Sequence, residues 1–111
     1  MAALTPLSAA EVSARIKAGK AVLVDIREPD EIAQERIAGS VVKSLSAFDA
    51  ADIDHRPDQD VIYMCRSGAR TGMNCIRLAA QVPGEAFVLE GGLNAWKAQG
   101  LPTISGFGKP A

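Results

Sequence analysis

The stretch CRSGART, residues 65–71, holds the side chains best suited to chemistry in this chain. Cys65 directly follows the apolar run VIYM, and the residues after it include Arg66, Gly68 and Arg70. If this stretch curls around the sulfur, its backbone amides face the thiol, and the helix that begins behind it adds its positive end. Cysteines in such positions have pKa values lowered from about 8.5 to roughly 3.5–7.5. The loop therefore predicts a thiolate nucleophile that needs no neighbouring histidine.

The two arginines of this loop are expected to bring positive charge to its mouth, where a small dianion would be attracted and oriented. Simple solvation of the guanidinium groups is the alternative, and for Arg66 taken alone we favour it. For Cys65 the alternative is a buried, inert thiol. Its place between a buried strand and a loop with glycine and arginine favours the reactive interpretation.

Other polar candidates are interpreted as structural. Asp25 and Arg27 lie at the end of another apolar run, where ion pairs that support loops are more usual than catalytic carboxylates. Cys75 is predicted to pack on the inner face of the next helix, with a resolving-cysteine role as the weaker alternative. Trp96 is predicted to be a core anchor, and His55 to be exposed.

The elements that must position the loop follow an alternating pattern. Ser8 and Glu11 form a capping-box signature at the start of a helix that Gly19 ends. The expected strands are 21–25, 60–65 and 86–90 with a short one within 37–44, and the further expected helices are 29–36, 70–82 and 92–100. Such alternation predicts an α/β fold with a parallel sheet. Ligands of these sheets gather beyond the carboxyl ends of the strands, where DIREP, CRSGART and LEGGLN arrive.

Composition narrows the function further. The 111 residues fit one domain, and 12 basic against 13 acidic residues give a net charge of -1, which invites neither nucleic acid nor anionic membrane. No apolar run is long enough to span a bilayer, and the N-terminus lacks a secretory signal, so a cytoplasmic protein is expected. Two cysteines and one histidine match no metal pattern, and neither a metal nor a cofactor is expected.

Three segments in this order resemble the rhodanese family of thiosulfate-type sulfurtransferases: LVDIREPDE, CRSGART and LEGGLNAWKAQGLP. The resemblance covers about residues 5–103 and leaves 104–111 as a tail of a single domain, 1–111. The sequence is also similar to the cytoplasmic rhodanese domain of some bacterial inner-membrane sulfurtransferases. One departure is ERIAGS, where the family often shows Gly-His-Ile-x-Gly-Ala.

The resemblance implies a parallel sheet of about five strands with helices on both faces. It also implies that Cys65 takes the outer sulfur of thiosulfate or of a persulfide donor. The resulting persulfide then passes this sulfur to a thiophilic acceptor such as cyanide, a small thiol or a protein. The persulfide would be cradled by the backbone amides of Arg66, Ser67, Gly68, Ala69, Arg70 and Thr71.

Three rival functions stay open at this point. A phosphatase or arsenate reductase of the related fold has five residues between cysteine and arginine, whereas four separate Cys65 from Arg70 here, which fits sulfur better than phosphate. A persulfide carrier with little thiosulfate activity has the same sequence features as an enzyme. A non-catalytic scaffold is the remotest option, because the cysteine and its loop are complete.

Overall fold

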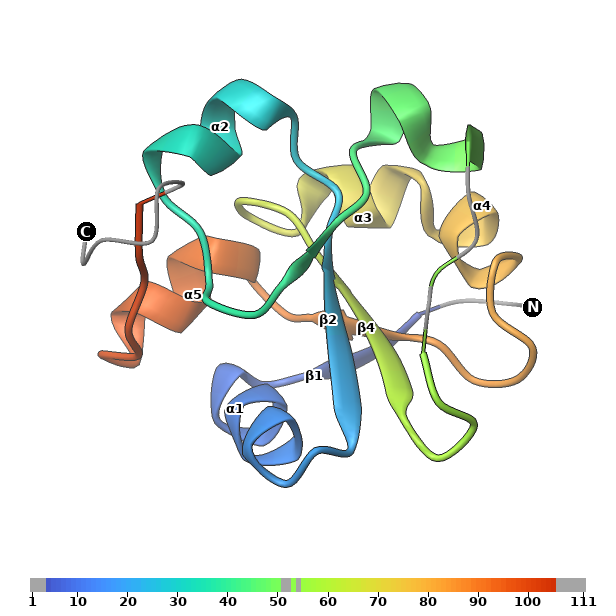
Figure 1. The fold of residues 1–111 in the computed structure, drawn as a ribbon, viewed down its shortest axis with the longest axis horizontal. Coiled ribbons are helices and arrows are strands. Elements are labelled where there is room, and N and C mark those ends of the chain that lie inside the picture. Colours follow the sequence, from blue (N-terminus) through green and yellow to red (C-terminus); the bar gives the residue numbers. More distant parts are fainter. Residues whose placement is uncertain (1–3, 51–52, 54, 106–111) are drawn as a thin grey trace.

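A five-stranded parallel sheet forms the centre of the molecule, as predicted (Figure 1). The structure, a computed structural model, describes residues 4–50, 53 and 55–105. The strands lie in the order β1-β5-β4-β2-β3. Their bounds are β1 Thr5–Leu7, β2 Ala21–Asp25, β3 Val41–Val42, β4 Asp60–Met64 and β5 Phe87–Leu89. The best formed pairing joins β2 to β4 in register over five residues of each strand.

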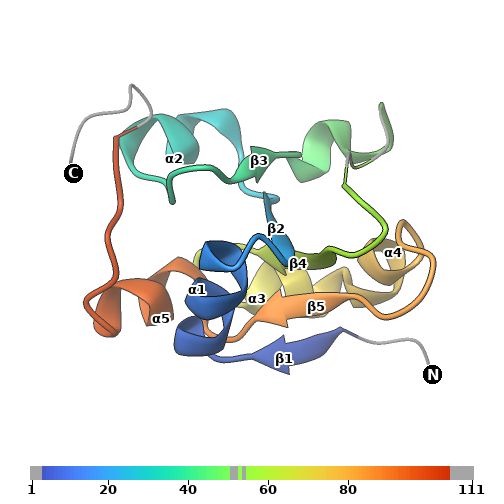
Figure 2. The same cartoon turned by 60° about the horizontal axis from the view of Figure 1, so that its bottom comes forward.

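Helices cover both faces of this sheet (Figure 2). On one face α1 and α5 pack over a cluster that includes Ile62 and Met64. On the other face Val61, Tyr63 and Cys65 belong to a second cluster, together with Phe48 and Leu78 from the covering helices. The helices are α1 Ala9–Lys17, α2 Pro29–Gln34, the 3₁₀ helix η1 Leu45–Ala50, α3 Ala69–Met73, α4 Cys75–Ala79 and α5 Gly92–Ala98. Because β4 is buried on both faces, it shows the continuous apolar run that the sequence analysis recognised.

Local signals explain where the first two helices begin. Ser8 and Glu11 form the predicted capping box, with Ser8 Oγ accepting from the Glu11 amide at 3.2 Å. Pro29 stands at the first position of α2, where its missing amide costs no hydrogen bond. Irregular chain was expected at residues 44–59, and η1 is the short helix allowed for there.

Three details differ from the expectations. Strand β1 was not predicted, because it has only three residues and Pro6 stands in its middle, which an edge strand tolerates. The helix expected over 70–82 is broken at Asn74, which leaves helical geometry with φ -114° and ψ 16°, and whose side-chain amide donates to the Arg70 carbonyl at 2.8 Å beside the backbone bond to the same oxygen. Strand β4 ends at Met64, so Cys65 is the first residue after the strand and not its last.

Over residues 4–50, 53 and 55–105, no helix has the length and apolar character that a membrane span needs.

Candidate functional site

The loop after β4 lies at the carboxyl end of the central strand of the sheet (Figure 1). Its neighbours β2 and β5 run parallel to β4, so their carboxyl ends reach the same rim. The three segments DIREP, CRSGART and LEGGLN therefore meet there, as the sequence pattern predicted. Gly68 has φ 98°, which allows the chain to turn sharply before α3 begins at Ala69.

The sulfur of Cys65 is enclosed by this loop. Only 1% of the residue is exposed, and the Gly68 amide donates to its sulfur at 3.1 Å. Burial by itself raises the pKa of the Cys65 thiol. Hydrogen bonding from the amides of Thr71, Gly68 and Arg70, and from the Thr71 hydroxyl 3.8 Å away, outweighs burial and lowers the pKa below its ordinary value. The loop thus stabilises a thiolate through its backbone amides and the Thr71 hydroxyl.

The carbonyls of the same loop are bound from the other side by α5. The Leu93 amide donates to the Cys65 carbonyl and the Asn94 amide donates to the Arg66 carbonyl, both at 2.9 Å. Gly92 makes this approach possible, because it has φ 58° and a Cβ there would overlap the Cys65 carbonyl oxygen and lie 2.8 Å from the Arg66 carbonyl. The start of α5 therefore holds the loop carbonyls away from the sulfur.

The arginines of the loop are not simply solvated. Arg70 forms a bidentate ion pair with Glu31 of α2, with N–O distances of 2.6 and 2.8 Å, and Arg66 lies 3.8 Å from the same carboxylate. The hydrogen bonds from Arg70 lower the pKa of Glu31 to about 2. Glu31 therefore stays ionised and offsets positive charge that the sequence analysis assigned to the mouth of the loop.

A second ion pair supports the rim from within. Asp25 and Arg27 are fully buried, and the Arg27 guanidinium donates to the Asp25 carboxylate at 2.8 to 3.2 Å. Arg27 also donates to the Glu35 carbonyl at the end of α2, and the Ser44 hydroxyl donates to the Arg27 carbonyl. This pair ties the turn between β2 and α2 to the end of α2.

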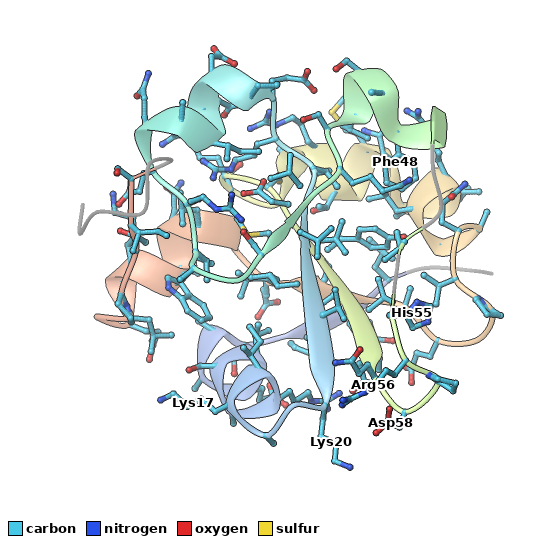
Figure 3. The ribbon with its side chains drawn as sticks, in the orientation of Figure 1. Lys17, Lys20, Phe48, His55, Arg56 and Asp58 are labelled. Carbon is cyan, nitrogen blue, oxygen red and sulfur yellow. The ribbon has the colours of Figure 1, made fainter. Side chains whose placement is uncertain are left out.

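Other candidates lie outside the sulfur cradle. Ser67 and Ala69 are exposed, with the Ala69 amide donating to the Ser67 hydroxyl at 3.4 Å. His55 was expected to be exposed but is half-buried. Its Nδ1 lies 3.2 Å from the Ile53 carbonyl, and Figure 3 shows it away from the loop.

Cys75 was wrongly assigned to a packed inner face. It lines a cavity, while its neighbour Ile76 is 63% exposed.

Known proteins share the fold described above. Residues 8–99 match the family model described as rhodanese-like domain. A sulfurtransferase of Allochromatium vinosum is 38% identical over 84 residues, which cover 76% of this chain and 78% of that protein. The chain therefore belongs to the rhodanese-like family.

Solved structures show the same architecture. A rhodanese-related protein of Thermoplasma volcanium superposes with a TM-score of 0.74 at 25% identity, covering 90% of this chain and 97% of that one. A thiosulfate sulfurtransferase of Pseudomonas aeruginosa gives a TM-score of 0.75 at 23% identity, with 96% of this chain matched to 21% of that one. The second likeness concerns the fold alone.

Gly92→Ala should destabilise the protein through its contact with the loop. We expect a loss of roughly 3 kcal/mol, because left-handed backbone strain and steric overlap with Cys65 add together. Gly39→Ala is the matched control: Gly39 has φ 80° and open space around it, so only the strain of about 1 kcal/mol applies. Urea unfolding measures both losses. An equal decrease in the free energy of unfolding for the two variants would show that the contact of Gly92 with the loop does not contribute to stability.

The ion pair of Glu31 predicts a pH-dependent stability. Its pKa is lower in the folded than in the unfolded state, so its contribution is complete above about pH 4.5 and is lost as the pH falls toward 2. We expect Glu31→Gln to cost about 1 kcal/mol at pH 7 and much less at pH 3. Urea unfolding at several pH values compares the two proteins. A constant difference between them would contradict the ionised pair.

The cradle also predicts the titration of Cys65. Thiolate absorbance of the wild type minus that of Cys65→Ser should rise at a midpoint below about 8.5, the ordinary value. Thr71→Val removes the hydroxyl near the sulfur and should move the midpoint upward. Cys75→Ser is the control for the second thiol. A midpoint at or above the ordinary value would disprove the role of the loop amides.

Proposed function

We propose that this protein is a sulfurtransferase that moves the outer sulfur of thiosulfate, or of a persulfide donor, through a persulfide on Cys65. The observation that carries the proposal is a buried thiol whose pKa is lowered by loop amides at the end of β4. Membership of the rhodanese-like family and the similarity to a sulfurtransferase support sulfur transfer in general.

The chemistry suits a site whose sulfur is held as a thiolate, because neither step needs a base. The Cys65 thiolate attacks the outer sulfur of thiosulfate, the sulfur–sulfur bond breaks, and its electron pair leaves with sulfite. An acceptor such as cyanide then attacks the outer sulfur of the persulfide, and thiocyanate leaves while Cys65 returns to thiolate. Each step exchanges one sulfur bond for another and moves no proton at the sulfur, as in thiol–disulfide exchange.

The loop supports both halves of this cycle in the same way. Its amides stabilise negative charge, whether the charge is on the resting thiolate or on the outer sulfur of the persulfide. They also make Cys65 a better leaving group, because a thiolate of lower pKa leaves faster. The curl from Cys65 to α3 places these donors by backbone geometry, so their positions do not depend on flexible side chains.

Phosphate chemistry is less well supported. A phosphatase needs the arginine of its loop to bind the phosphoryl oxygens, whereas Arg70 is held by Glu31 in a bidentate pair. The short spacing from Cys65 to Arg70 points the same way. Hydrolysis of p-nitrophenyl phosphate by the wild type, lost in Cys65→Ser, would reverse this ranking.

Intact mass spectrometry after thiosulfate treatment tests the proposal directly. We expect one added sulfur atom on the wild type and on Cys75→Ser, and none on Cys65→Ser. Cyanide should remove this sulfur as thiocyanate, and turnover of Cys65→Ser should fall by at least about 10³-fold, as for the loss of a covalent nucleophile.

The same experiment separates an enzyme from a carrier. Loading by a persulfide donor but not by thiosulfate identifies a persulfide relay with the same nucleophile. Sulfur found on Cys75, or a wild type that no donor loads, would disprove the assignment of Cys65.

A further inference from the structure

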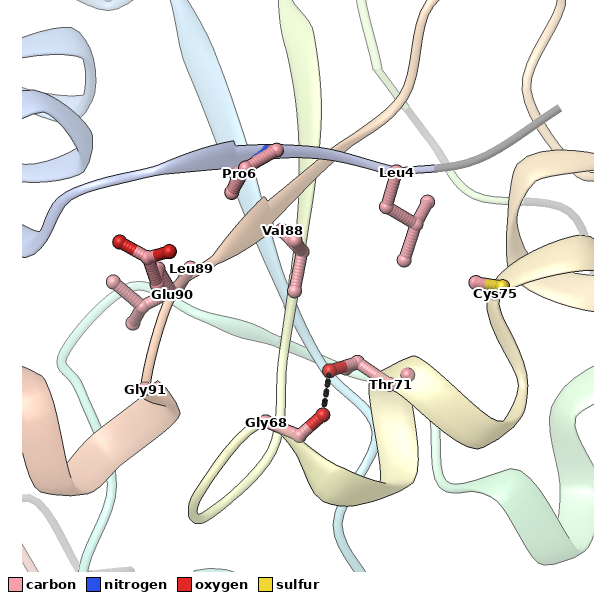
Figure 4. Close-up of a pocket in the computed structure, with 10 residues that line it drawn as sticks. Leu4, Pro6, Gly68, Thr71, Cys75, Val88, Leu89, Glu90 and Gly91 are labelled. Atoms are coloured by element: carbon pink, nitrogen blue, oxygen red, sulfur yellow. Dashed lines mark hydrogen bonds between the residues drawn. The ribbon is translucent and has the colours of Figure 1, made fainter. Parts of the chain in front are cut away.

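A cavity of about 320 Å³ lies beside the cysteine loop, between the β1–β5 edge of the sheet and the helices α3 and α4 (Figure 4). Gly68 and Thr71, which contribute to the sulfur cradle, also line the cavity. Figure 4 shows Val88 pointing from β5 toward the helix of Thr71. The lining also includes the apolar residues Leu4, Pro6 and Leu89, and Gly72 of α3. The cavity therefore adjoins the group that we propose to carry sulfur.

The walls of this cavity do not suit an inorganic anion. Most of the lining is apolar, and among the lining residues that the structure describes Glu90 is the one with a charged side chain. An anion placed there would lose hydration without gaining a cationic partner. The nearby Arg70 is paired with Glu31, so its charge is already offset. Apolar walls instead stabilise carbon groups, and a carboxylate at the edge tolerates a cation.

The volume sets the size of the ligand. Small-molecule sites occupy about 300–1,000 Å³, so this cavity is at the lower end of that range. It fits a compact organic group of a few carbon atoms. Thiosulfate and cyanide have no such group and would gain nothing from these walls.

We propose that the cavity binds the organic part of a small uncharged or cationic thiol, which is the acceptor of the sulfur on Cys65. This inference rests on the proposed function. The thiol gives its proton to solvent, and its thiolate attacks the outer sulfur of the Cys65 persulfide. The bond between that sulfur and Sγ breaks, its electron pair returns to Cys65 as a thiolate, and the acceptor leaves as an organic persulfide.

Gly72 offers a way to fill the cavity without straining the chain. It lies inside α3 with no positive φ, and a Cβ built on it meets nothing within 4 Å. Gly72→Leu should therefore occupy the cavity, and it should favour the helix because glycine is the poorer helix former by about 0.8–1.0 kcal/mol relative to alanine. Ala80→Leu is the matched control, because Ala80 is an exposed residue at the end of α4 that does not line the cavity.

The test uses the 111-residue protein, first loaded with persulfide and checked by mass. Single-turnover transfer is then measured to 1-propanethiol, cysteamine, mercaptoacetate and cyanide, with rates expressed per thiolate for the thiols. In the wild type we expect 1-propanethiol and cysteamine to react faster than mercaptoacetate. Gly72→Leu should lower the ratio of the 1-propanethiol rate to the cyanide rate about tenfold, the equivalent of burying roughly two methylene groups. Ala80→Leu should leave this ratio unchanged.

Glu90→Lys provides a second variant whose exposed position leaves the core intact. Reversing this charge should raise the mercaptoacetate rate and lower the cysteamine rate by several-fold each. The cavity assignment is overturned if Gly72→Leu slows cyanide and 1-propanethiol equally, or if mercaptoacetate is the fastest thiol in the wild type. A protein that no donor loads would instead disprove the proposed function. The protein could instead load sulfur and turn over cyanide, while Gly72→Leu leaves the ratio of the 1-propanethiol rate to the cyanide rate unchanged. That result would disprove the role of the cavity and leave the proposed function standing.

Discussion

The contact between Gly92 and the backbone of Cys65 and Arg66 is the constraint on which the site depends. A peptide unit has its amide and its carbonyl on opposite sides, so a loop can turn amides toward a sulfur only if its carbonyls find donors elsewhere. The start of α5 supplies these donors from the amides of Leu93 and Asn94. A side chain at position 92 would separate the two backbones and remove this arrangement. The last helix, α5, therefore supports the loop conformation that places amides around the sulfur of Cys65.

The groups that carry positive charge or partial positive charge around the loop differ in their distance from the sulfur of Cys65. Backbone amides lie against Cys65, whereas the charged guanidinium of Arg70 is drawn toward α2 by Glu31. Amide dipoles stabilise a negative sulfur without adding a mobile cation that could also attract other anions. Glu31 thus holds the loop to α2, and it reduces the general attraction for anions that two free arginines would create.

Much of this could be predicted from the sequence, for identifiable reasons. Strands β2 and β4 are buried on both faces, so their apolar runs are continuous, and the loop that follows β4 contains the cysteine and the glycine that its curl requires. Strand β1 escaped prediction because three residues cannot show an alternating pattern. The pair of Arg70 with Glu31 could not be predicted, because 39 positions separate the two residues and only the packing of α2 beside the loop joins them.

The prediction for Cys75 was wrong because the periodicity of apolar residues does not reveal a break within a helix. Periodicity assigned it to the inner face of one long helix, but the break at Asn74 turns α4, so that Leu78 packs inward and Cys75 faces the cavity. The break lies at Asn74, and the cavity lies next to α3 and α4 beside the β1–β5 edge. The fold packs tightly around Cys65 and leaves an apolar space next to it, which is the arrangement from which we propose that a reaction partner is selected by shape. Glu31 offsets the charge of Arg70 at the loop, so in this proposal the carbon groups that the cavity can bury and the carboxylate of Glu90 together decide the partner.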